Sequence, residues 1–520
     1  MIHDVAIVGC GPVGATAAHL LGKAGLSVLV LEREPDPHPL PRAVHIDHEM
    51  MRIFQGIGLI DRLLPLMRET DGHLHIGADG GVIRYLGSAG QARPFGWAND
   101  YFFYQPELEG VLRGGLSTYP AVDLRLGAEL VGLDQGDDHV TLHLADGDRA
   151  SARYVIACDG ARSLVRKALD IRLDDLRFEE PWLVVDAELD GPVRFPDFTG
   201  LPPAANLQKL SVMLCDPRRP ATIVPGRGNH RRWEFMLLPG EDDREMMQPE
   251  KVAELLAPWV EGVPHRLVRA ATYRFHGLVA LEWQRDRVFL AGDAAHQTPP
   301  FFGQGMCHGM RDVANLAWKL ELVLSGRADA ALLTTYQPER DPHVRAVIGA
   351  AVAAGRYICE LDPVKAAARD AEMRQRAATP GATAADLIPP YRQGVVGDGG
   401  GPRFIQPRVT DAAGTAWLLD DVTGGGFVLL RGPGAGDIAL PPVLVGLGVK
   451  VCHIGRDLLD ESGMLAAWFD RQGLSPAASV LLRPDAYIFG LAADDTDLPD
   501  LAAQLATTLH MMKEGITCPA

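Results

Sequence analysis

The sequence has no Cys-x-x-Cys pair, and its seven cysteines are scattered along 520 residues. This spacing indicates neither a disulfide framework nor a zinc site, so a cytoplasmic, reducing location is expected. The sequence also lacks an apolar run of about 20 residues, the length that spans a bilayer. No N-terminal targeting segment is expected, because Met1–Asp4 leads directly into a predicted strand. We therefore expect no association with a membrane.

Positive charge is scarce, since 50 lysines and arginines face 67 aspartates and glutamates and the formal net charge is −17. An acidic chain is poorly suited to nucleic acid, which is not expected as a partner. No metal is expected either. His45, Asp47, His48 and Glu49 are close in sequence, but helical spacing would scatter them around a helix. The length allows two or three domains with a large core.

The most informative segment is a glycine-rich turn, Gly9–Gly14, that follows the apolar run Asp4–Val8. A helical pattern after the turn and a second apolar run, Leu26–Leu31, complete a β-α-β unit. Glycines in such a turn let the backbone approach a pyrophosphate, and the helix N-terminus offers it free N–H groups. Glu32 ends the second strand, where a carboxylate accepts ribose hydroxyls. The alternative, a glycine turn beside a surface glutamate, is disfavoured by the complete unit.

Two further motifs, Cys158–Ser163 and Ala291–His296, each follow a run typical of a buried strand. Asp293 is suited to bind a ribityl hydroxyl. The helix predicted from Gly305 would point its positive N-terminus at a flavin pyrimidine. The alternative for Gly303–Gly305 is an ordinary loop before a helix. The three motifs together predict binding of an extended dinucleotide, FAD.

The remaining pattern predicts further strands and helices. Ala121–Leu133 and His139–Leu144 alternate as hairpin strands do, and alternating runs within about 175–275 indicate a mostly antiparallel sheet. Gly305–Leu324 is a strong helical pattern, and helix is expected to continue to about Cys359. Residues 377–403 are predicted to be a linker. Strands are then expected at Phe427–Leu430, Val443–Leu447 and Val480–Leu482, with a helix near Met464–Gln472.

Eight strings carry a family likeness. They are Pro41–Asp47, Phe95–Trp97, Gln105-Pro106, Val155–Gly160, Arg232–Met236, Ala291–His296, Gly303–Met306 and Arg311–Leu320. With these strings the chain resembles the single-component FAD-dependent aromatic hydroxylases, the group built like para-hydroxybenzoate hydroxylase. Within that group it is most similar to the 3-(3-hydroxyphenyl)propionate hydroxylases. The likeness covers about residues 3–355 and is more specific for the flavoprotein group than for the substrate.

The resemblance implies a particular α/β architecture. A Rossmann-like FAD-binding domain would occupy 1–175 and 276–376, and an inserted, mostly antiparallel β-sheet substrate domain would occupy 176–275 with parts of 70–105. The segment 404–520 resembles the thioredoxin-like C-terminal domain of related hydroxylases, because Arg483–Phe489 is similar to their Arg-Pro-Asp-Gly motif, with Ala486 in place of the glycine. Without a Cys-x-x-Cys pair, this domain is expected to support structure or oligomerisation.

The resemblance also implies which residues bind the cofactor. The ADP half would be held around the first turn, the ribityl and pyrophosphate region by Gln105 and Asp293, and the flavin ring by backbone N–H groups of Gly305 and Met306. Asn315 would support that loop, and Asp159 and Gly160 belong to a motif associated with both FAD and the nicotinamide donor. The complete predicted set is Gly9, Gly11, Pro12, Val13, Gly14, Glu32, Arg33, Arg42, Gln105, Leu130, Asp159, Gly160, Gly292, Asp293, Pro299, Gly303, Gly305, Met306 and Asn315.

The implied activity is hydroxylation of a phenolic aromatic compound similar to 3-hydroxyphenylpropionate. NADH or NADPH would reduce the flavin and leave, and O2 would form a flavin C4a-hydroperoxide that oxygenates the ring. A phenol loses its proton near pH 10, so a base would help. Candidates for that catalytic role are His45, Tyr104 and His308, each of which has a structural role as its alternative. An anionic substrate would favour an arginine such as Arg232 or Arg274.

Other functions stay open. The same machinery could act on a polycyclic aromatic polyketide, as a hydroxylase or as a Baeyer–Villiger enzyme. A flavin halogenase is disfavoured, because the Trp-x-Trp-x-Ile-Pro string of that family is absent. A non-enzymatic flavin-binding module is the remaining alternative. The protein is expected to be a monomer or a homodimer.

Overall fold

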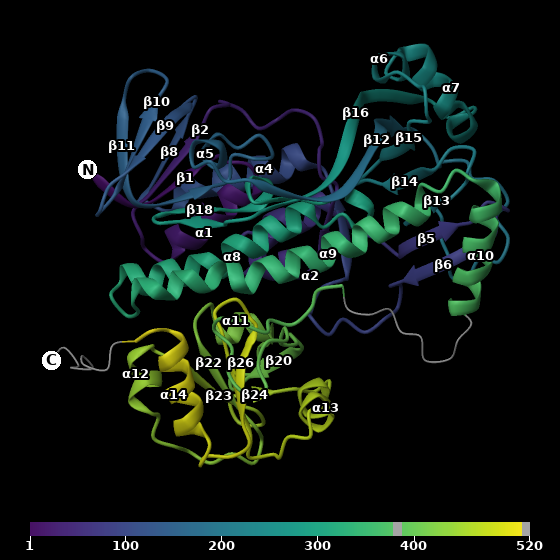
Figure 1. Ribbon diagram of the computed structural model, residues 1–520. Coiled ribbons are helices and arrows are strands. Elements are labelled where there is room, and N and C mark those ends of the chain that lie inside the picture. The colour runs from purple at the N-terminus through teal and green to yellow at the C-terminus, as the bar shows by residue number, and fades with distance from the viewer. Residues whose placement is uncertain (378–386, 512–520) are drawn as a thin grey trace.

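The computed structural model describes residues 1–377 and 387–511. Its helices and strands form a mixed α/β fold with several separate sheets (Figure 1), which confirms the expected α/β class at this level. Among the described residues, no helix is both long enough and apolar enough to cross a membrane.

The first sheet carries the glycine-rich turn at the end of a central strand. Its strand order is β17-β18-β11-β1-β2-β8, with β10 paired to β11 and β9 paired to β10. The strands are β1 (Ile2–Val8), β2 (Val28–Glu32), β8 (Val122–Leu126), β9 (Leu130–Gln135), β10 (Val140–Leu144), β11 (Arg149–Ala157), β17 (Gln284–Arg285) and β18 (Val288–Leu290). Because β1, β2, β11 and β18 run parallel, the segments that follow them meet at one edge of the sheet.

Burial on both faces explains the apolar runs of these parallel strands. Val5, Ile7, Leu29 and Ile156 are fully buried. Helix α1 (Pro12–Lys23) follows β1 and begins with Pro12, whose missing N–H costs nothing at the first helical position. Helix α4 (Gln105–Gly115) packs against α1, and α5 (Leu164–Ala168) packs against β9 of the same sheet.

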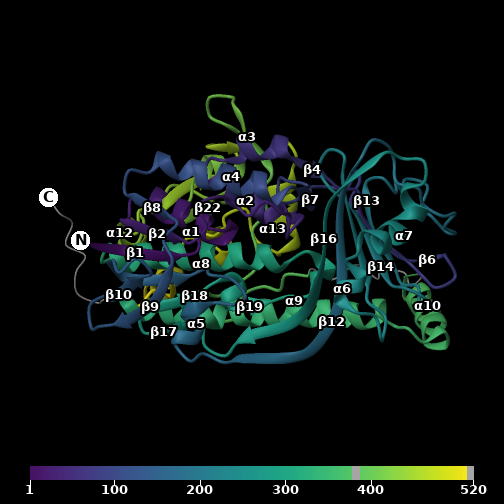
Figure 2. The same cartoon turned by 90° about the horizontal axis from the view of Figure 1, so that it is seen from above.

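The second sheet has the order β19-β16-β12-β15-β14-β13-β5-β6. Its strands are β5 (Gly72–Ile76), β6 (Val82–Gly87), β12 (Leu173–Leu189), β13 (Leu210–Leu214), β14 (Ala221–Pro225), β15 (His230–Met236), β16 (His265–Ala280) and β19 (His296–Gln297). All neighbours except β13 and β5 are antiparallel. The long strands β12 and β16 run together away from the first sheet (Figure 2). One side of this sheet packs its apolar side chains against α7 (Pro249–Val260), with α6 (Asp243–Met246) next to it.

A small sheet links the two larger ones. It consists of β3 (His45–Asp47), β7 (Asp100–Phe103) and β4 (Met67–Glu69), and helices α2 (His48–Gly56) and α3 (Ile60–Leu63) follow β3. Asp47 ends β3 and caps α2, because its side chain accepts hydrogen bonds from the backbone N–H groups of Glu49 and Met50. This cap fixes the start of α2 next to the small sheet.

Two long helices, α8 (Gly305–Leu324) and α9 (Tyr336–Ile358), lie between the sheets and the C-terminal part of the chain (Figure 1). Helix α10 (Pro363–Ala377) packs beside β6, where Asp370 accepts a hydrogen bond of 2.7 Å from the Ala78 N–H. This helix therefore contacts the second sheet and not the first, although the sequence had grouped it with the predicted FAD-binding domain.

The C-terminal part contains a four-stranded sheet in the order β23-β22-β25-β26. Its elements are β22 (Val428–Arg431), α12 (Pro442–Gly446), β23 (Lys450–His453), α13 (Met464–Arg471), β25 (Ser479–Leu482), β26 (Ile488–Ala492) and α14 (Leu498–Thr508). A small sheet of β20 (Arg408–Asp411), β21 (Ala416–Leu418) and β24 (Leu458–Leu459) and helix α11 (Leu419–Thr423) lie beside it. Apolar residues of the four-stranded sheet pack on Trp318 and Leu322 of α8.

Two predicted strands are wrong. Ala121–Leu133 is not one hairpin strand, because the chain turns at Gly127, where φ is +73°. The first half, β8, instead pairs in parallel with β2, and only β9 forms the hairpin with β10. Val443–Leu447 is mostly the helix α12, which begins at Pro442, and the strand follows it as β23.

The predicted linker, 377–403, is not a solvated spacer over the residues that the structure describes. Tyr391 and Val395 are buried, and residues 378–386 lie outside the described residues. Residues 512–520, which include Cys518, also lie outside them.

Candidate active site

The three sequence motifs meet at one edge of the first sheet. Gly9 has a φ of +97°, and a Cβ at this position would lie 2.5 Å from the carbonyl oxygen of Cys158. The first motif therefore touches the second. A Cβ on Gly292 would lie 3.2 Å from the Val13 side chain, so the third motif touches the first. The second motif follows the first by about 150 residues and the third follows it by about 280, and these contacts bring all three around a single site.

The first turn leaves the N-terminus of α1 open. A Cβ on Gly14 would lie 1.9 Å from the Gly9 carbonyl oxygen, so only glycine permits this close approach of helix and strand. Gly11 is the N-cap, and no side chain caps the helix there. No described atom lies within 4 Å of the position that a Cβ on Gly11 would take. The helix therefore presents free N–H groups to open space, as binding of a phosphate requires.

Glu32 binds the backbone of the same turn. Its Oε2 accepts a hydrogen bond of 2.7 Å from the Cys10 N–H, and its Oε1 accepts one of 2.9 Å from the Glu34 N–H. The carboxylate thus stands at the end of β2 beside the glycine-rich turn, where the sequence placed a ribose contact. Arg33, in contrast, is exposed and pairs with Glu34 at 3.2 Å.

Gln105 joins the segment around Arg42 to helix α4. Its side-chain oxygen accepts hydrogen bonds from the N–H groups of Arg42, at 3.1 Å, and Ala43, at 2.7 Å. Its amide nitrogen donates to Glu109 at 2.6 Å. The Arg42 side chain is exposed, and its positive charge lies close enough to act on the Asp293 carboxylate. The structure therefore brings Arg42, Gln105 and Asp293 together.

Helix α4 also contributes two residues that the sequence interpretation missed. Arg113 donates from Nε to the Cys10 carbonyl at 3.0 Å, and its Nη2 lies 3.7 Å from both Glu32 and Glu109. Its Nη1 is buried without a hydrogen-bond partner among the described residues. Because Gln105, Glu109 and Arg113 are spaced four residues apart, helical periodicity was the signal that could have found them.

Asp159, in the second motif, offers a free acceptor. Its Oδ2 accepts a hydrogen bond of 3.1 Å from the Val165 N–H, whereas its Oδ1 is buried without a partner among the described residues. Gly160 has a φ of +79°, which a turn at this point requires. Arg166, another residue that was missed, bridges the second and third motifs by donating to the carbonyls of Ala161 and Ala294 at 2.9 and 2.8 Å.

Asp293, in the third motif, is exposed, so its carboxylate is accessible to a ligand. No hydrogen bond or ion pair reaches its carboxylate from any residue that the structure describes. FAD supplies hydroxyls and phosphate oxygens. A buried arginine N–H, two carboxylates with free oxygens and an open helix N-terminus fit such a group.

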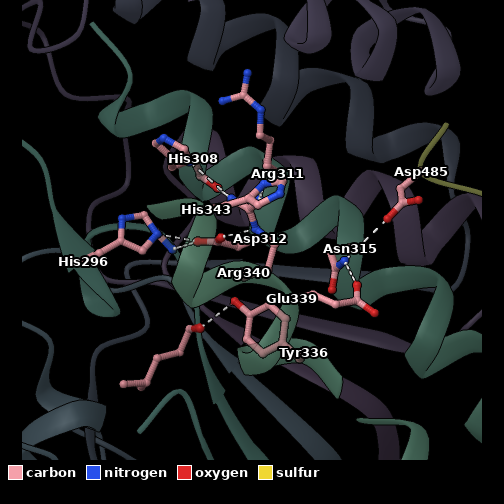
Figure 3. A network of polar contacts seen from close by, with 12 residues as sticks. His296, His308, Arg311, Asp312, Asn315, Tyr336, Glu339, Arg340, His343 and Asp485 are labelled. Carbon is pink, nitrogen blue, oxygen red and sulfur yellow. Dashed lines mark hydrogen bonds and ion pairs between the residues drawn. The ribbon is translucent and has the colours of Figure 1, made fainter. Parts of the chain in front are cut away.

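A network of buried polar side chains stands behind the third motif (Figure 3). Asp312 accepts hydrogen bonds from the Gly292 N–H at 3.0 Å and the His296 ring at 2.7 Å, and Arg340 donates to it at 2.9 Å. His308, a predicted catalytic residue, lies fully inside this network beside Arg340. Burial holds the pKa of His308 well below its ordinary value, so its ring is neutral. The geometry therefore does not favour a role for it in proton transfer with a substrate.

Asn315 also lies inside the network. Its amide nitrogen bonds to Glu339, and Asp485 of the C-terminal part lies 3.5 Å away. The structure thus places it at the contact between α8, α9 and the C-terminal part and not at the loop before α8. Of the other predicted positions, Pro12 and Val13 begin α1, Leu130 is buried in β9, Pro299 precedes the loop, and Gly305 and Met306 begin α8.

Residues 303–306, which end the loop before α8 and form the first two positions of that helix, are called the flavin loop below, after the sequence prediction. Gly303 has a φ of +63°, and a Cβ there would collide with the His45 ring at 2.5 Å. His45 lies with one ring nitrogen, Nδ1, 3.2 Å from the Gly303 carbonyl and with the other, Nε2, 2.7 Å from Asp100. Both neighbours are acceptors, an arrangement that favours hydrogen on both ring nitrogens, as in an imidazolium. Burial alone would lower the pKa of His45, but the hydrogen bond and charge of Asp100 outweigh burial and raise it.

His73 completes this group, with its Nε2 3.8 Å from Asp100. Ligand atoms of His45, His73 and Asp100 all lie within 4.8 Å of one another, a spacing that could hold a metal ion. Because both nitrogens of His45 are already bonded to acceptors, neither is free to ligate. The absence of a metal stays a prediction.

His73 places one side of the second sheet next to the flavin loop. Directly paired residues on neighbouring strands point to the same side of a sheet. Pairing connects His73 to Ser211, and Val224 to Arg232 and Asp186. The adjacent row on that side contains His75, Met213, Thr222, Glu234 and Val184. Polar and titratable groups therefore line the side that faces away from α7.

Glu234 differs from the other acids on this side. No described residue forms a hydrogen bond or ion pair with its carboxylate, whereas Asp186 is paired with Arg232 at 2.9 Å and with Arg269 at 3.1 Å. Burial raises the pKa of Glu234, although Arg232 opposes the effect. An unpaired carboxyl group with a raised pKa is typical of a site that exchanges protons. The sequence interpretation had quoted Glu234 only as part of a family string.

The remaining candidates lie elsewhere. Arg232 is buried, and it donates to the carbonyls of Pro41 and Arg42 at 2.8 and 2.7 Å. It therefore supports the Arg42 segment and has no free group for an anionic substrate. Arg274 is exposed beside Glu179 and Asp243. Tyr104 precedes α4, and its ring contacts His230 at 5.7 Å.

A cavity of about 720 Å³ lies away from these motifs. Residues of α1, α2, α8 and the C-terminal part line it, among them Glu49, Arg311, Trp318, Trp417 and Tyr487. It belongs to the contact with the C-terminal part. The candidate active site is instead defined by the three motifs, the flavin loop and the side of the second sheet that faces them.

This geometry combines an open helix N-terminus and carboxylates, which suit an extended dinucleotide, with a neighbouring sheet that carries titratable side chains. Comparison with known proteins agrees. The family model described as "FAD binding domain" matches residues 3–351, and the chain belongs to that family. The predicted resemblance to FAD-dependent aromatic hydroxylases is confirmed by relatives that match nearly the whole chain.

Two of these relatives come from bacteria. A probable NADH-specific resorcinol 4-hydroxylase of Rhodococcus jostii (strain RHA1) is 36% identical, over 97% of this chain and 95% of its own. A 3-(3-hydroxy-phenyl)propionate/3-hydroxycinnamic acid hydroxylase of Burkholderia cenocepacia (strain HI2424) is also 36% identical, with the same coverage. Among solved structures, aklavinone-11 hydroxylase in complex with FAD and aklavinone is 25% identical, with a TM-score of 0.79, covering 98% of this chain and 99% of its own.

Proposed function

We propose that the protein is an NAD(P)H-dependent FAD monooxygenase that hydroxylates a small phenolic compound. The observation that carries the proposal is the meeting of the three motifs beside the titratable side of the second sheet. The 36% identity to hydroxylases named for resorcinol and for hydroxyphenylpropionate supports a single-ring phenol as the substrate. NADH is the favoured electron donor, because the Rhodococcus relative is named as NADH-specific.

The proposal includes a division of the chain. Residues 1–175 and 276–362 would form a Rossmann-like FAD-binding domain, and 176–275 with β5, β6 and α10 would form the substrate domain. Residues from 404 would form a thioredoxin-like domain, for which the mixed pairing in β23-β22-β25-β26 is the support. The moved boundary follows from α10, which packs beside β6.

In this proposal FAD binds along the edge of the first sheet. The open N-terminus of α1 and Arg113 hold the pyrophosphate and ribose end together with Glu32, and Asp293 binds a ribityl hydroxyl. The flavin loop receives the ring. Bound FAD supplies the redox chemistry, which is acceptance of hydride from NAD(P)H and activation of O2.

The side chains of this chain handle protons and exclude water. Glu234 takes the proton of the phenol, since its carboxylate is unpaired and faces the same side as His73. His45 holds a positive charge against the Gly303 carbonyl and stabilises negative charge that develops at the ring. His45 is thus retained as a functional candidate, as a donor and not as a base. Tyr104 and His308 are not given a role.

A panel of phenols tests the proposal. Purified protein loaded with FAD should oxidise NADH faster when resorcinol or 3-(3-hydroxyphenyl)propionate is added, and mass spectrometry should detect a product with one added oxygen. If no phenol stimulates NADH oxidation or yields such a product, the proposal fails.

A second candidate is hydroxylation of a polycyclic aromatic compound. The likeness to aklavinone-11 hydroxylase over nearly the whole chain favours it. The same panel with a polycyclic phenol separates the two candidates, because turnover of only the polycyclic compound would select this one.

A further inference from the structure

The C-terminal part of the chain contacts the remainder through three different kinds of interaction. Apolar side chains pack around Trp318, and Arg483 forms a buried ion pair of 2.7 Å with Glu339. A third contact is made by Tyr487, whose hydroxyl donates to Glu49 Oε1 at 3.0 Å. This third contact leads toward the flavin loop.

The path from Tyr487 to the loop consists of three successive hydrogen bonds. Glu49 Oε2 accepts a hydrogen bond of 2.6 Å from Arg311 Nε. The Nη1 of the same guanidinium donates to the side-chain oxygen of Gln304 at 3.0 Å. Gln304 is the second residue of the flavin loop. We call Tyr487, Glu49, Arg311 and Gln304 the tether.

Every member of the tether is held in place by burial. Tyr487 and Arg311 are 2% exposed, Gln304 is 5% exposed and Glu49 is 8% exposed. Arg311 also pairs with Asp47, and Glu49 also lies 3.5 Å from Arg403. Charge-assisted bonds of this kind are short and directional, and they are stronger where water is excluded.

The conformation of the turn before Tyr487 directs this side chain toward Glu49. Arg483 donates to Asp485 at 3.0 Å, and Ala486 adopts a left-handed conformation with a φ of +63°. A non-glycine residue in that conformation is unfavourable, so surrounding contacts must hold the turn. The cavity of about 720 Å³ lies beside the tether, with Glu49, Arg311 and Tyr487 in its wall. Apolar packing is therefore incomplete at this point, and the polar bonds make the connection.

We propose that Tyr487 is a positioning residue for the flavin loop: through Glu49 and Arg311 it fixes Gln304, so that the C-terminal part sets the loop that receives the flavin ring. This inference rests on the proposed function, because that function assigns the flavin ring to the loop. It gives the C-terminal part a role in cofactor binding that needs no cysteine pair.

The test uses the full-length protein loaded with FAD and the variant Tyr487→Phe, which removes one hydroxyl and no charge. We expect the dissociation constant for FAD to rise about fivefold, the scale of coupling through a packed polar network. Gln304→Leu cuts the last bond of the tether and should reproduce this loss. The double variant should bind FAD no more weakly than Gln304→Leu alone, because both changes break the same path.

A matched control lies at the same contact. Asp420→Asn weakens the bond that Arg52 makes with Asp420 at 2.7 Å, which joins α2 to the C-terminal part without leading to the loop. This variant should lower the melting temperature and leave the dissociation constant for FAD within twofold of the wild type. If Asp420→Asn weakens FAD binding as much as Tyr487→Phe does, loosening of the whole contact explains the effect and the proposal is overturned.

Two further outcomes also decide the matter. A Tyr487→Phe protein that binds FAD as the wild type does overturns the proposal, as do additive losses in the double variant. If Tyr487→Phe does not fold, Glu49→Gln tests the tether from α2, and unchanged FAD binding there overturns the proposal equally.

Failure of this inference can be told apart from failure of the proposed function. A wild-type protein that binds no FAD would contradict the proposed function itself. A wild type that binds FAD and a Tyr487→Phe variant that binds it equally well contradict only this inference.

Discussion

The first and second sheets contribute to the candidate active site in different ways. At the edge of the first sheet, glycines such as Gly9 and Gly14 let backbone segments approach closely, and a few side chains at the ends of the strands add to the backbone N–H groups. On the second sheet, the binding groups come from side chains such as His73 and Glu234 that strand pairing brings to one side. The first region can bind a cofactor common to many proteins. The second can be changed residue by residue, which suits selection of a substrate.

If this comparison is correct, a change on the second sheet should affect turnover without affecting FAD. Glu234→Gln removes the proposed base and keeps the shape of the side chain, so we expect kcat to fall about 100-fold. Steady-state kinetics with the preferred phenol and titration with FAD measure the two properties. Thr222→Val, directly opposite Glu234 on β14, is the control and should retain most activity. A Glu234→Gln enzyme with wild-type kcat would remove Glu234 from the mechanism.

The converse change is on the first sheet. Asp293→Ala should raise the dissociation constant for FAD about 30-fold, because it removes a hydrogen bond to a charged group. Fluorescence quenching during titration of apoprotein with FAD measures this constant. Asp293→Asn keeps one acceptor oxygen and should lose less affinity. If Asp293→Ala keeps its yellow colour through gel filtration, the carboxylate does not bind the cofactor.

The link between the two regions is His45, and its charge predicts a dependence of stability on pH. His45 faces Asp100 on β7, the Gly303 carbonyl and His73 on β5, with Asp47 nearby on its own strand. The folded protein raises the pKa of His45, so its contribution to stability is complete below the unfolded pKa of about 6.5. That contribution is lost as the pH rises through the higher folded pKa.

Chemical denaturation of the wild type and His45→Gln at a series of pH values tests this sign. The wild type should exceed the variant in stability most at pH 5.5, and the difference should shrink as the pH rises to 9. Asp100 stays ionised throughout this range, because burial, which would raise its pKa, is outweighed by the hydrogen bonds and charges of His45 and His73 together, and the pKa is lowered. A difference that grows with pH would contradict the imidazolium assignment.

The smallest expected effect concerns the C-terminal part. Ala486 has a φ of +63° where related proteins were expected to have glycine. Ala486→Gly should stabilise the protein by about 0.5–1 kcal/mol, since glycine adopts this conformation without a steric penalty. Thermal unfolding with FAD bound measures it. A lower melting temperature would show that the alanine methyl group packs usefully at this turn.

The difference between the two sheets also explains what the sequence could predict. The parallel strands and the glycine motifs depend on local pattern, so Gly9, Asp159 and Asp293 could be assigned to one site before their contacts were known. Arg113 was missed because its function depends on contacts with Cys10 and Glu32, which are about 100 and 80 residues away. The one local sign of Arg113 was its place in the series Gln105, Glu109 and Arg113, which are spaced four residues apart along a helix.

The side of the second sheet could not be predicted for a different reason. Glu234 and His73 lie together only because β15, β14, β13 and β5 pair in that order and register. A strand pattern reveals alternation but not the identity of its neighbours. Asn315 shows a different limit of the sequence. The family resemblance implied that it supports the flavin loop, whereas its contacts in α8 are with Glu339 and Asp485.

The most direct test follows oxygen during turnover. FAD-loaded protein, NADH and a phenol are combined under isotopically labelled O2, and the product is analysed by mass spectrometry. The account predicts one labelled oxygen atom in each molecule of hydroxylated phenol, formed only when FAD is bound. NADH consumption that yields hydrogen peroxide and no labelled phenol, across both single-ring and polycyclic compounds, would contradict it.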